Sequence, residues 1–362
     1  MQKKDFESAL KVNQGIEQPP AINPYLKNFY KKNRVKLLSE DEYVEGITSG
    51  NTSILSQAIT LVESSKSDHR AMAQKIITRS IPHAVKSMRI GITGVPGAGK
   101  STFIEAFGSL ITNKGHKLAV LAIDPSSEKS KGSILGDKTR METLCNDPNA
   151  FIRPSPSSGS LGGVAQKTRE SIILCEAAGY DVIFIETVGV GQSETTVHSM
   201  CDFFLLLMLA GAGDELQGIK RGIMEMSDLI AITKADGNNK DKATLAKALY
   251  KNALHLFPPT ESGWVPTALS TSSVTKLGLE EVLEKITEYF DMAHNSGYYL
   301  HKRREQSRFW MYETIQEELK EHFFENEIVK NSILDYESKV LHGEISSFAA
   351  ATKLMDLYKS QI

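Results

Sequence analysis

The stretch of sequence that decides the fold is residues 94–101, Gly94-Val95-Pro96-Gly97-Ala98-Gly99-Lys100-Ser101. The stretch fits the phosphate-loop pattern G-x-x-x-x-G-K-[ST] at every fixed position. Residues 88–93 before it have the pattern of a short buried strand, and residues 102–107 after it begin a helical pattern. A glycine loop between a strand and a helix directs backbone N–H groups and the helix dipole at one anion. This context argues against the alternative, a chance glycine-rich turn.

The residue types in this loop suit a nucleotide phosphate chain. Gly94, Gly97 and Gly99 let the backbone wrap phosphates without Cβ clashes. The ammonium of Lys100 would reach the β- and γ-phosphates, and the hydroxyl of Ser101 would ligate Mg²⁺. The loop therefore predicts a nucleoside triphosphate bound together with magnesium.

The composition is that of an ordinary globular protein and excludes several partner classes. Among 362 residues, 42 basic and 44 acidic side chains leave a net charge of −2, so we expect no nucleic-acid or membrane partner. The three cysteines are isolated and indicate reduced thiols rather than disulfides or a zinc site. The N-terminus lacks an apolar signal core and the longest apolar run, residues 203–212, is half a membrane span. These features predict a cytoplasmic protein.

The central part of the chain alternates strand and helix patterns. Beyond residues 88–93, strands are expected at 117–124, 151–153, 182–186, 203–209, 228–233 and 265–270. Helices are expected between them at 164–178, 240–255 and 279–292. Near-continuous apolar runs are typical of parallel strands that are covered on both faces. The fold class is therefore α/β, with a doubly wound, mostly parallel sheet of P-loop NTPase type.

Helical patterns flank this central domain on both sides. The predicted organisation is an N-terminal helical extension at 1–87, a P-loop domain at 88–292 and a C-terminal helical arm at 293–362. Apolar residues from Ile54 to Val62 recur at helical spacing, and Trp310, Ile315 and Leu319 form a mixed stripe in the arm. Since such an arm cannot bury its apolar face alone, we expect it to pack on the N-terminal helices or on a second subunit.

A second motif selects the base. Thr233-Lys234-Ala235-Asp236 follows a buried-strand pattern and matches [NT]-K-x-D, the guanine-reading loop of GTPases. The carboxylate of Asp236 can accept hydrogen bonds from guanine N1–H and the 2-amino group, whereas adenine would leave that buried charge unpaired. The stem of Lys234 can lie along the purine face. A surface Lys–Asp pair in a turn is the alternative interpretation.

Acidic residues also follow the ends of predicted strands. Asp124, Asp137 and Glu186 lie at or soon after carboxyl ends of strands, where parallel sheets gather their ligands. Because Mg²⁺ takes few carboxylates and keeps waters, one or two of the three would ligate it directly or through water. Gly189 suits a backbone N–H that contacts the γ-phosphate. For Asp124, a helix or turn cap is the alternative role.

Several segments in one order make the chain resemble the MeaB/ArgK family, the methylmalonyl-CoA mutase-associated GTPases. They are Gly94–Thr102, Asp124–Ser127, Gly136–Met141, 151–156 with 159–163, Glu186–Glu194, Gly211–Gly222 and Thr233–Asp236. The motifs E-T-V-G-V-G-Q-S-E and G-A-G-D-E-L-Q-G-I-K are far more specific than the phosphate loop. The resemblance covers roughly residues 40–340.

The resemblance implies a homodimeric P-loop GTPase that binds GTP or GDP with Mg²⁺. It implies a chaperone for an adenosylcobalamin-dependent acyl-CoA mutase, which gates cofactor delivery and protects or reactivates the mutase. A cobalamin adenosyltransferase is a further candidate partner. The resemblance leaves open which acyl-CoA mutase is meant.

Site residues are carried over position by position. Gly94–Thr102, with Ala98 and Thr102 included, would bind phosphates. Asp124 to Asp137 would form the first switch near Mg²⁺, Glu186–Gln192 the second, and Gly211–Arg221 a further switch that contacts the mutase.

The base-reading loops show two departures from the family pattern. Ser272 and Ser273 would lie in the last base-contacting loop, where Ser273 replaces the usual Ala. Thr233 stands where the family has Asn, so we expect one hydrogen bond between the base loop and the phosphate loop to weaken.

Catalysis by such a site would consist of positioning and charge stabilisation. The catalytic candidates are Lys100, Asp137, Glu186, Gln192 and Lys220. Gln192 could position the water or only bond within its loop, and Lys220 or Arg221 could approach the nucleotide once a partner orders the segment. The alternatives are a nickel-enzyme maturation GTPase, which the scattered nine histidines disfavour, a kinase linked to amino-acid transport, and a scaffold with a degenerate site.

Overall fold

The computed structural model describes residues 37–124, 141–156, 161–187, 193–210 and 221–360. The chain divides into two units, Met1–Ser39 and Glu40–Ile362. The architecture described below is that of the second unit. Within the described residues, no helix combines the length and the apolar character needed to cross a membrane.

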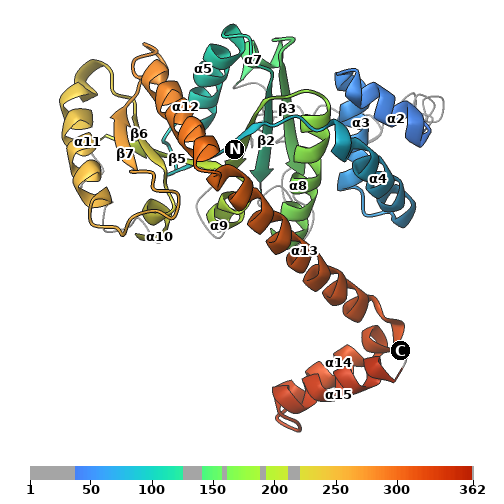
Figure 1. Ribbon diagram of the computed structural model, residues 1–362. Coiled ribbons are helices and arrows are strands. Elements are labelled where there is room, and N and C mark those ends of the chain that lie inside the picture. Colours follow the sequence, from blue (N-terminus) through green and yellow to red (C-terminus); the bar gives the residue numbers. More distant parts are fainter. Residues whose placement is uncertain (1–36, 125–140, 157–160, 188–192, 211–220, 361–362) are drawn as a thin grey trace, which may run out of the picture. The chain divides into compact units, whose positions relative to one another are not determined.

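A sheet of seven parallel strands forms the centre of this unit, in the order β3-β2-β4-β1-β5-β6-β7 (Figure 1). The strands are β1 Met88–Gly94, β2 Leu118–Asp124, β3 Ala150–Pro156, β4 Val182–Thr187, β5 Phe203–Leu209, β6 Leu229–Thr233 and β7 Thr267–Ser270. Every strand expected from the sequence is present within a few residues of its predicted bounds. The parallel sheet with flanking helices confirms the predicted α/β fold of P-loop NTPase type.

Helices cover both faces of the sheet. On one face, α5 (Lys100–Asn113) and α12 (Leu279–Asn295) pack on apolar side chains of β1, β2, β4, β5 and β6. On the other face lie α8 (Leu161–Ala177), α9 (Ser193–His198) and α11 (Lys240–Leu254). Burial on both faces explains why the strands read as apolar runs. The strand β5, which the longest apolar run predicted, is buried in the middle of this sheet.

Three N-terminal helices pack beside the sheet. They are α2 (Glu40–Thr48), α3 (Thr52–Glu63) and α4 (Ser67–Ser80), and α3 contacts both α8 and the edge strand β3. Arg153 of β3 pairs with Glu63 of α3 and also donates to Ser56 Oγ at 3.3 Å. Short segments complete the unit: η1 (Ile81–His83), α7 (Glu142–Cys145), α10 (Arg221–Glu225) and η3 (Gly237–Asn239).

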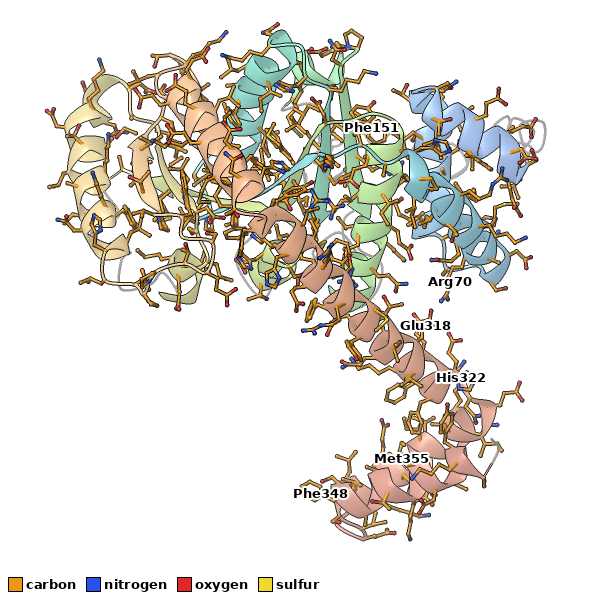
Figure 2. All side chains as sticks on the ribbon, in the orientation of Figure 1. Arg70, Phe151, Glu318, His322, Phe348 and Met355 are labelled. Atoms are coloured by element: carbon orange, nitrogen blue, oxygen red, sulfur yellow. The ribbon has the colours of Figure 1, made fainter. Side chains whose placement is uncertain are left out.

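The chain ends in three helices, α13 (Tyr298–Glu325), α14 (Glu327–Leu341) and α15 (Ser347–Lys359). The second half of α13 approaches the N-terminal helices, where Arg70 Nη1 of α4 lies 2.9 Å from Glu321 Oε2 (Figure 2). This ion pair is one contact between the arm and the N-terminal helices, and packing of the arm on those helices or on a second subunit stays a prediction. The expected stripe does not form one buried face, because Trp310 is half-buried while Ile315 and Leu319 are exposed.

A buried ionic network fixes α13 to the sheet. Arg303 of α13 makes a two-point contact with Asp202, with Nε–Oδ1 at 2.6 Å and Nη2–Oδ2 at 2.7 Å. Arg89 of β1 makes the same kind of contact with Glu176 of α8, with both N–O distances 2.9 Å. Arg303 Nη1 joins the two pairs at 3.2 Å from Glu176 Oε1. Breaking a buried pair of this kind costs roughly 3–5 kcal/mol, so the start of α13 is firmly held.

Candidate functional site

The phosphate loop connects the end of β1 to the start of α5. Gly97 and Gly99 have φ angles of 78° and 81°, a left-handed conformation that favours glycine. Gly94 is needed for a different reason: a Cβ there would lie 2.5 Å from the carbonyl oxygen of Leu207 in β5. Ala98 is buried and Thr102 is exposed at the first turn of α5. The loop geometry is thus that of the strand–loop–helix motif predicted for phosphates.

Lys100 lies folded over this loop. Its Nζ donates a hydrogen bond to the carbonyl oxygen of Gly94 at 2.9 Å. Burial lowers the pKa of the Lys100 ammonium, while the negative charges of Glu186 and Glu194 oppose that shift. The net shift disfavours the charged ammonium, and the two carboxylates reduce that effect of burial.

The described donors suit a magnesium ion. Ser101 is half-buried in the first turn of α5, and Glu186 is buried at the end of β4, paired in register with Ile92 of β1. A hydroxyl and a carboxylate are hard oxygen donors, which Mg²⁺ prefers along with phosphate oxygens and water. Among the residues that the structure describes, no three or more acidic, histidine or cysteine side chains gather around one point.

Several predicted site residues cannot be placed. Asp124 ends β2, but its side chain lies outside the described residues. Asp137, Gly189, Gln192 and Lys220 also lie outside them. Their roles stay predictions.

A buried pair of hydroxyls, which the sequence did not predict, joins two neighbouring strands. Thr187 Oγ1 donates to Thr93 Oγ1 at 2.8 Å, and both side chains are buried. Thr93 precedes Gly94 of the phosphate loop, and Thr187 follows Glu186. The pair therefore ties the strand before the phosphate loop to the strand before the predicted second switch. Only the pairing of β1 with β4, which the sequence does not show, brings these two threonines together.

The base loop lies beside the phosphate loop. Lys234 has a left-handed φ of 57°, and a Cβ on Gly99 would lie 3.9 Å from Lys234 Cε, so the lysine stem passes over the loop. The hydroxyl of Ser272 donates to Asp236 Oδ2. Ser272 is itself fixed, since its Oγ accepts from the N–H of Thr275 at 3.1 Å. The predicted guanine-reading carboxylate is thus oriented by the loop that contains Ser272 and the half-buried Ser273.

Thr233 connects the two loops directly. Its Oγ1 lies 2.8 Å from the carbonyl oxygen of Ala98 in the phosphate loop and 3.0 Å from that of Met208 in β5. The threonine therefore keeps a contact between the base loop and the phosphate loop. A hydroxyl has one hydrogen, so these two carbonyls share a single donor, where an amide would offer two.

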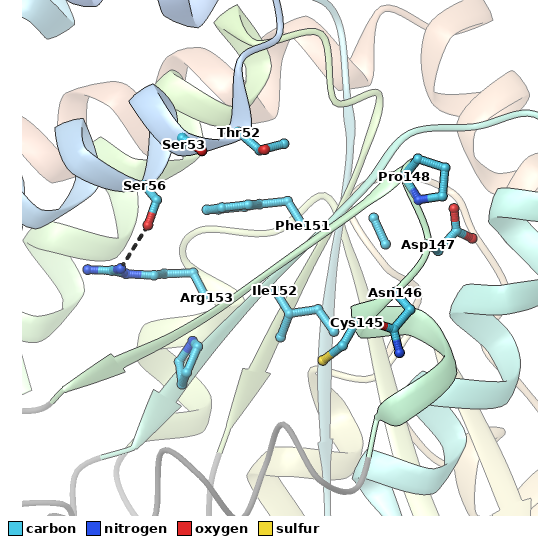
Figure 3. A pocket seen from close by; sticks show the side chains of 12 residues that line it. Thr52, Ser53, Ser56, Cys145, Asn146, Asp147, Pro148, Phe151, Ile152 and Arg153 are labelled. Carbon is cyan, nitrogen blue, oxygen red and sulfur yellow. Dashed lines mark hydrogen bonds between the residues drawn. The ribbon is translucent and has the colours of Figure 1, made fainter.

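The cavity in Figure 3 lies elsewhere, between α3, α7 and the edge strand β3. Its volume is about 920 Å³, and Arg153, Phe151 and Ser56 are among its lining residues. Arg153 is already engaged by Glu63 and Ser56. Among the residues that the structure describes, none of those predicted to bind nucleotide lines this cavity.

Comparisons with known proteins agree on one family. Residues 55–328 match the family described as "Methylmalonyl Co-A mutase-associated GTPase MeaB". The chain is 47% identical to "GTPase ArgK" of Escherichia coli over 286 residues, 79% of this chain and 86% of that protein. It is 45% identical to mouse "Methylmalonic aciduria type A homolog, mitochondrial" over 331 residues, 89% of this chain and 80% of that one.

A solved structure shows the same fold. The "LAO/AO transport system kinase" superposes with a TM-score of 0.70 at 36% sequence identity. The match covers 90% of this chain and 100% of the other.

The contact made by Thr233 predicts an effect on nucleotide affinity. In Thr233→Val the carbonyls of Ala98 and Met208 lose their shared donor, so the phosphate loop is held less firmly. We expect GDP affinity to fall roughly tenfold, since an unsatisfied buried group costs about 1–3 kcal/mol. Titration calorimetry measures this effect. Thr233→Ser should bind GDP as the wild type does, and so should Thr244→Val, whose hydroxyl bonds only its own helix. Unchanged GDP affinity in Thr233→Val would show that the connection is dispensable.

Proposed function

The chain belongs to the MeaB family of GTPases, and we propose that it hydrolyses GTP in support of an adenosylcobalamin-dependent acyl-CoA mutase of the methylmalonyl-CoA mutase type. It would gate delivery of the cofactor to the mutase and protect or reactivate it. The membership and the names of its relatives support the link to the mutase. The observation that carries the GTP assignment is the base loop, in which Thr233 bonds Ala98 of the phosphate loop and Asp236 is oriented by Ser272.

In this proposal each described group has a defined task. Gly97, Gly99 and the first turn of α5 bind the β- and γ-phosphates, and Lys100 leaves the Gly94 carbonyl to contact them. Ser101 and Glu186 would hold Mg²⁺, which would neutralise negative charge on the phosphates. Asp236, oriented by Ser272, reads the guanine edge.

The remaining roles come from the family resemblance. Asp124 and Asp137 assist at Mg²⁺, Gly189 contacts the γ-phosphate and Gln192 is the candidate for positioning water. Lys220 supplies a further cation when the mutase is bound. A GTPase that lacks a cation in place is slow by itself, so acceleration by a partner fits this arrangement.

The C-terminal helices support the proposal of a homodimer. They expose large apolar side chains that a solvated monomer would leave in water. These are Phe309, Met311, Tyr312, Ile315, Leu319, Phe324, Leu334, Leu341, Phe348 and Met355. Phe348 is 84% exposed on α15, and Figure 2 labels it with Met355 on the same helix.

Guanine selectivity gives the first test of this function. Wild-type protein should release phosphate from GTP and not from ATP. Asp236→Asn should lose GTP affinity and gain affinity for xanthosine triphosphate, whose 2-oxo group accepts from the new amide. Lys100→Ala, without the cation at the phosphates, is the inactive control. Equal wild-type affinity for ATP and GTP in competition binding would disprove the guanine assignment. Transfer of labelled γ-phosphate to a protein would favour a kinase.

Coupling to the mutase can be measured with purified components. A cognate adenosylcobalamin mutase should accelerate GTP hydrolysis. Replacing Lys220 and Arg221 together with alanine should remove most of that acceleration, because the partner can no longer bring a cation to the phosphates. Binding of the double variant to the mutase, followed by calorimetry, should persist. A double variant that is still fully stimulated would show that these cations are passive.

The dimer proposal predicts a solution mass of twice the 39.9 kDa chain. Light scattering at micromolar concentration measures it. Leu341→Glu with Phe348→Glu places charges on the exposed apolar face and should yield a monomer. Leu256→Glu changes an equally exposed leucine after α11 and should leave the mass unchanged. A monomeric wild type at these concentrations contradicts the proposal.

A further inference from the structure

One face of α13 binds the turn that joins α9 to β5, residues 199–202. Lys302, Gln306 and Trp310 are spaced by four residues, so their side chains leave the helix on the same side. Each of the three donates a hydrogen bond to a different main-chain carbonyl of this turn. We call these three side chains the α13 clamp.

The first two contacts hold the end of the turn. Lys302 Nζ donates to the carbonyl oxygen of Asp202 at 2.6 Å, and Gln306 Nε2 donates to that of Cys201 at 2.8 Å. Tyr289 Oη of α12 also donates to the carbonyl of Asp202, at 2.9 Å. Main-chain carbonyls that leave a helix need such partners when they are buried. The turn therefore takes its position in part from α13 and α12.

Trp310 makes the third contact, and two arginines lie over its ring. Its Nε1 donates to the carbonyl oxygen of Ser199 at 3.0 Å, directly after α9. The guanidinium carbons of Arg89 and Arg169 each lie 5.6 Å from the centre of its ring. The indole thus joins β1, α8 and the end of α9 at one point, with a polar bond and two cation–π contacts.

The clamped turn precedes β5, at the end of the sheet opposite the phosphate and base loops, and α9 joins it to the nucleotide side. The helix α9 begins at Ser193, directly after the predicted second switch Glu186–Gln192. A Cβ on Gly91 of β1 would lie 2.9 Å from side-chain atoms of Val197 and Cys201, so this segment packs directly on the strand that carries the phosphate loop. A shift of the chain at Ser193 must therefore move α9 as a unit or strain its contacts with β1 and the clamp.

The helix α13 also contacts the first turn of α8. A Cβ on Gly162, in the first turn of α8, would lie 2.4 Å from Glu317 Oε1 of α13. The side chain of Glu317 therefore packs directly against the backbone of α8 at Gly162. Beyond Glu317, α13 continues into α14 and α15. One continuous helix therefore connects the ends of α8 and α9 with the C-terminal helices.

We propose that the α13 clamp is a positioning element that couples GTP-versus-GDP discrimination to the C-terminal helices. The inference rests on the proposed GTPase function. GDP is held by the phosphate and base loops, which the clamp does not touch. In the proposed function the γ-phosphate contacts the predicted second switch, which precedes α9 in the chain, so its binding would depend on where the clamp holds that helix. Because coupling is reciprocal, a partner that binds α13–α15 more tightly in one nucleotide state changes the relative affinity for GTP and GDP.

Trp310→Phe tests the clamp, because phenylalanine keeps a ring between the arginines and removes the donor to Ser199. We expect GDP affinity to stay within twofold of wild type. Affinity for a non-hydrolysable GTP analogue should fall roughly fivefold, the factor that one neutral hydrogen bond contributes. Gln306→Met removes the donor to Cys201 at similar volume and should act in the same direction. Arg308→Gln, on the exposed side of α13, is the matched control and should change neither affinity.

Fluorescence provides a readout that general damage would not reproduce. The chain has two tryptophans, so Trp264→Phe leaves Trp310 as the single reporter. Its emission should differ between the GDP complex and the GTP-analogue complex. The difference between wild-type and Trp310→Phe spectra gives the same information without the Trp264 variant.

The possible outcomes separate this inference from the function on which it rests. Equal weakening of both nucleotides in Trp310→Phe, no change in either affinity, or identical Trp310 emission in the two complexes would each overturn the clamp. A wild-type protein that neither prefers guanine nucleotides nor hydrolyses GTP would refute the proposed function instead.

Discussion

Both nucleotide loops depend on the carboxyl end of β5. The phosphate loop leaves β1 while the N–H of Val95 donates to the carbonyl of Leu207 at 3.3 Å, and the missing side chain of Gly94 allows that approach. The base loop bonds the next carbonyl, that of Met208, through Thr233. Since Thr233 also bonds Ala98, the three segments hold one another in register. A distortion at the end of β5 would therefore reach the phosphates and the base together.

The opposite end of the sheet is held by charge rather than by glycine. There Arg89, Glu176, Asp202 and Arg303 join β1, α8, the start of β5 and α13. Buried ion pairs contribute little net stability compared with apolar packing, but they permit few alternative arrangements. Such a fixed arrangement suits α13, because its side chains must reach particular carbonyls of the turn at residues 199–202. The ionic network fixes where α13 starts, and the helix geometry then determines where Trp310 and Glu317 arrive.

The sequence predicted strands well where both faces of the strand are buried. It predicted much less where a contact joins residues that are far apart in the chain. The strand predicted at 151–153 extends to Pro156, because an edge strand tolerates prolines whose missing N–H groups face outward. The first helix of the predicted arm, α13, begins at Tyr298, directly after Gly297 with a φ of 76°. Motifs located Lys100 and Asp236. The partners of these residues, Glu194 and the oriented Ser272 hydroxyl, required the three-dimensional arrangement of strands. Lys302, Gln306 and Trp310 resemble an ordinary mixed helix surface until α9 is placed beside them.

The strand order has a consequence for how this chain is made. β1 lies at the centre of the sheet, yet its two neighbours come much later, with Met88 beside Val182 and Ile90 beside Phe203. At a ribosomal rate of about 5–20 residues per second, β1 waits on the order of ten seconds before both partners exist. During that time a strand of almost wholly buried residues has no sheet to join. Non-local parallel pairing of this kind is slow, and the nascent chain exposes its apolar centre until β5 emerges.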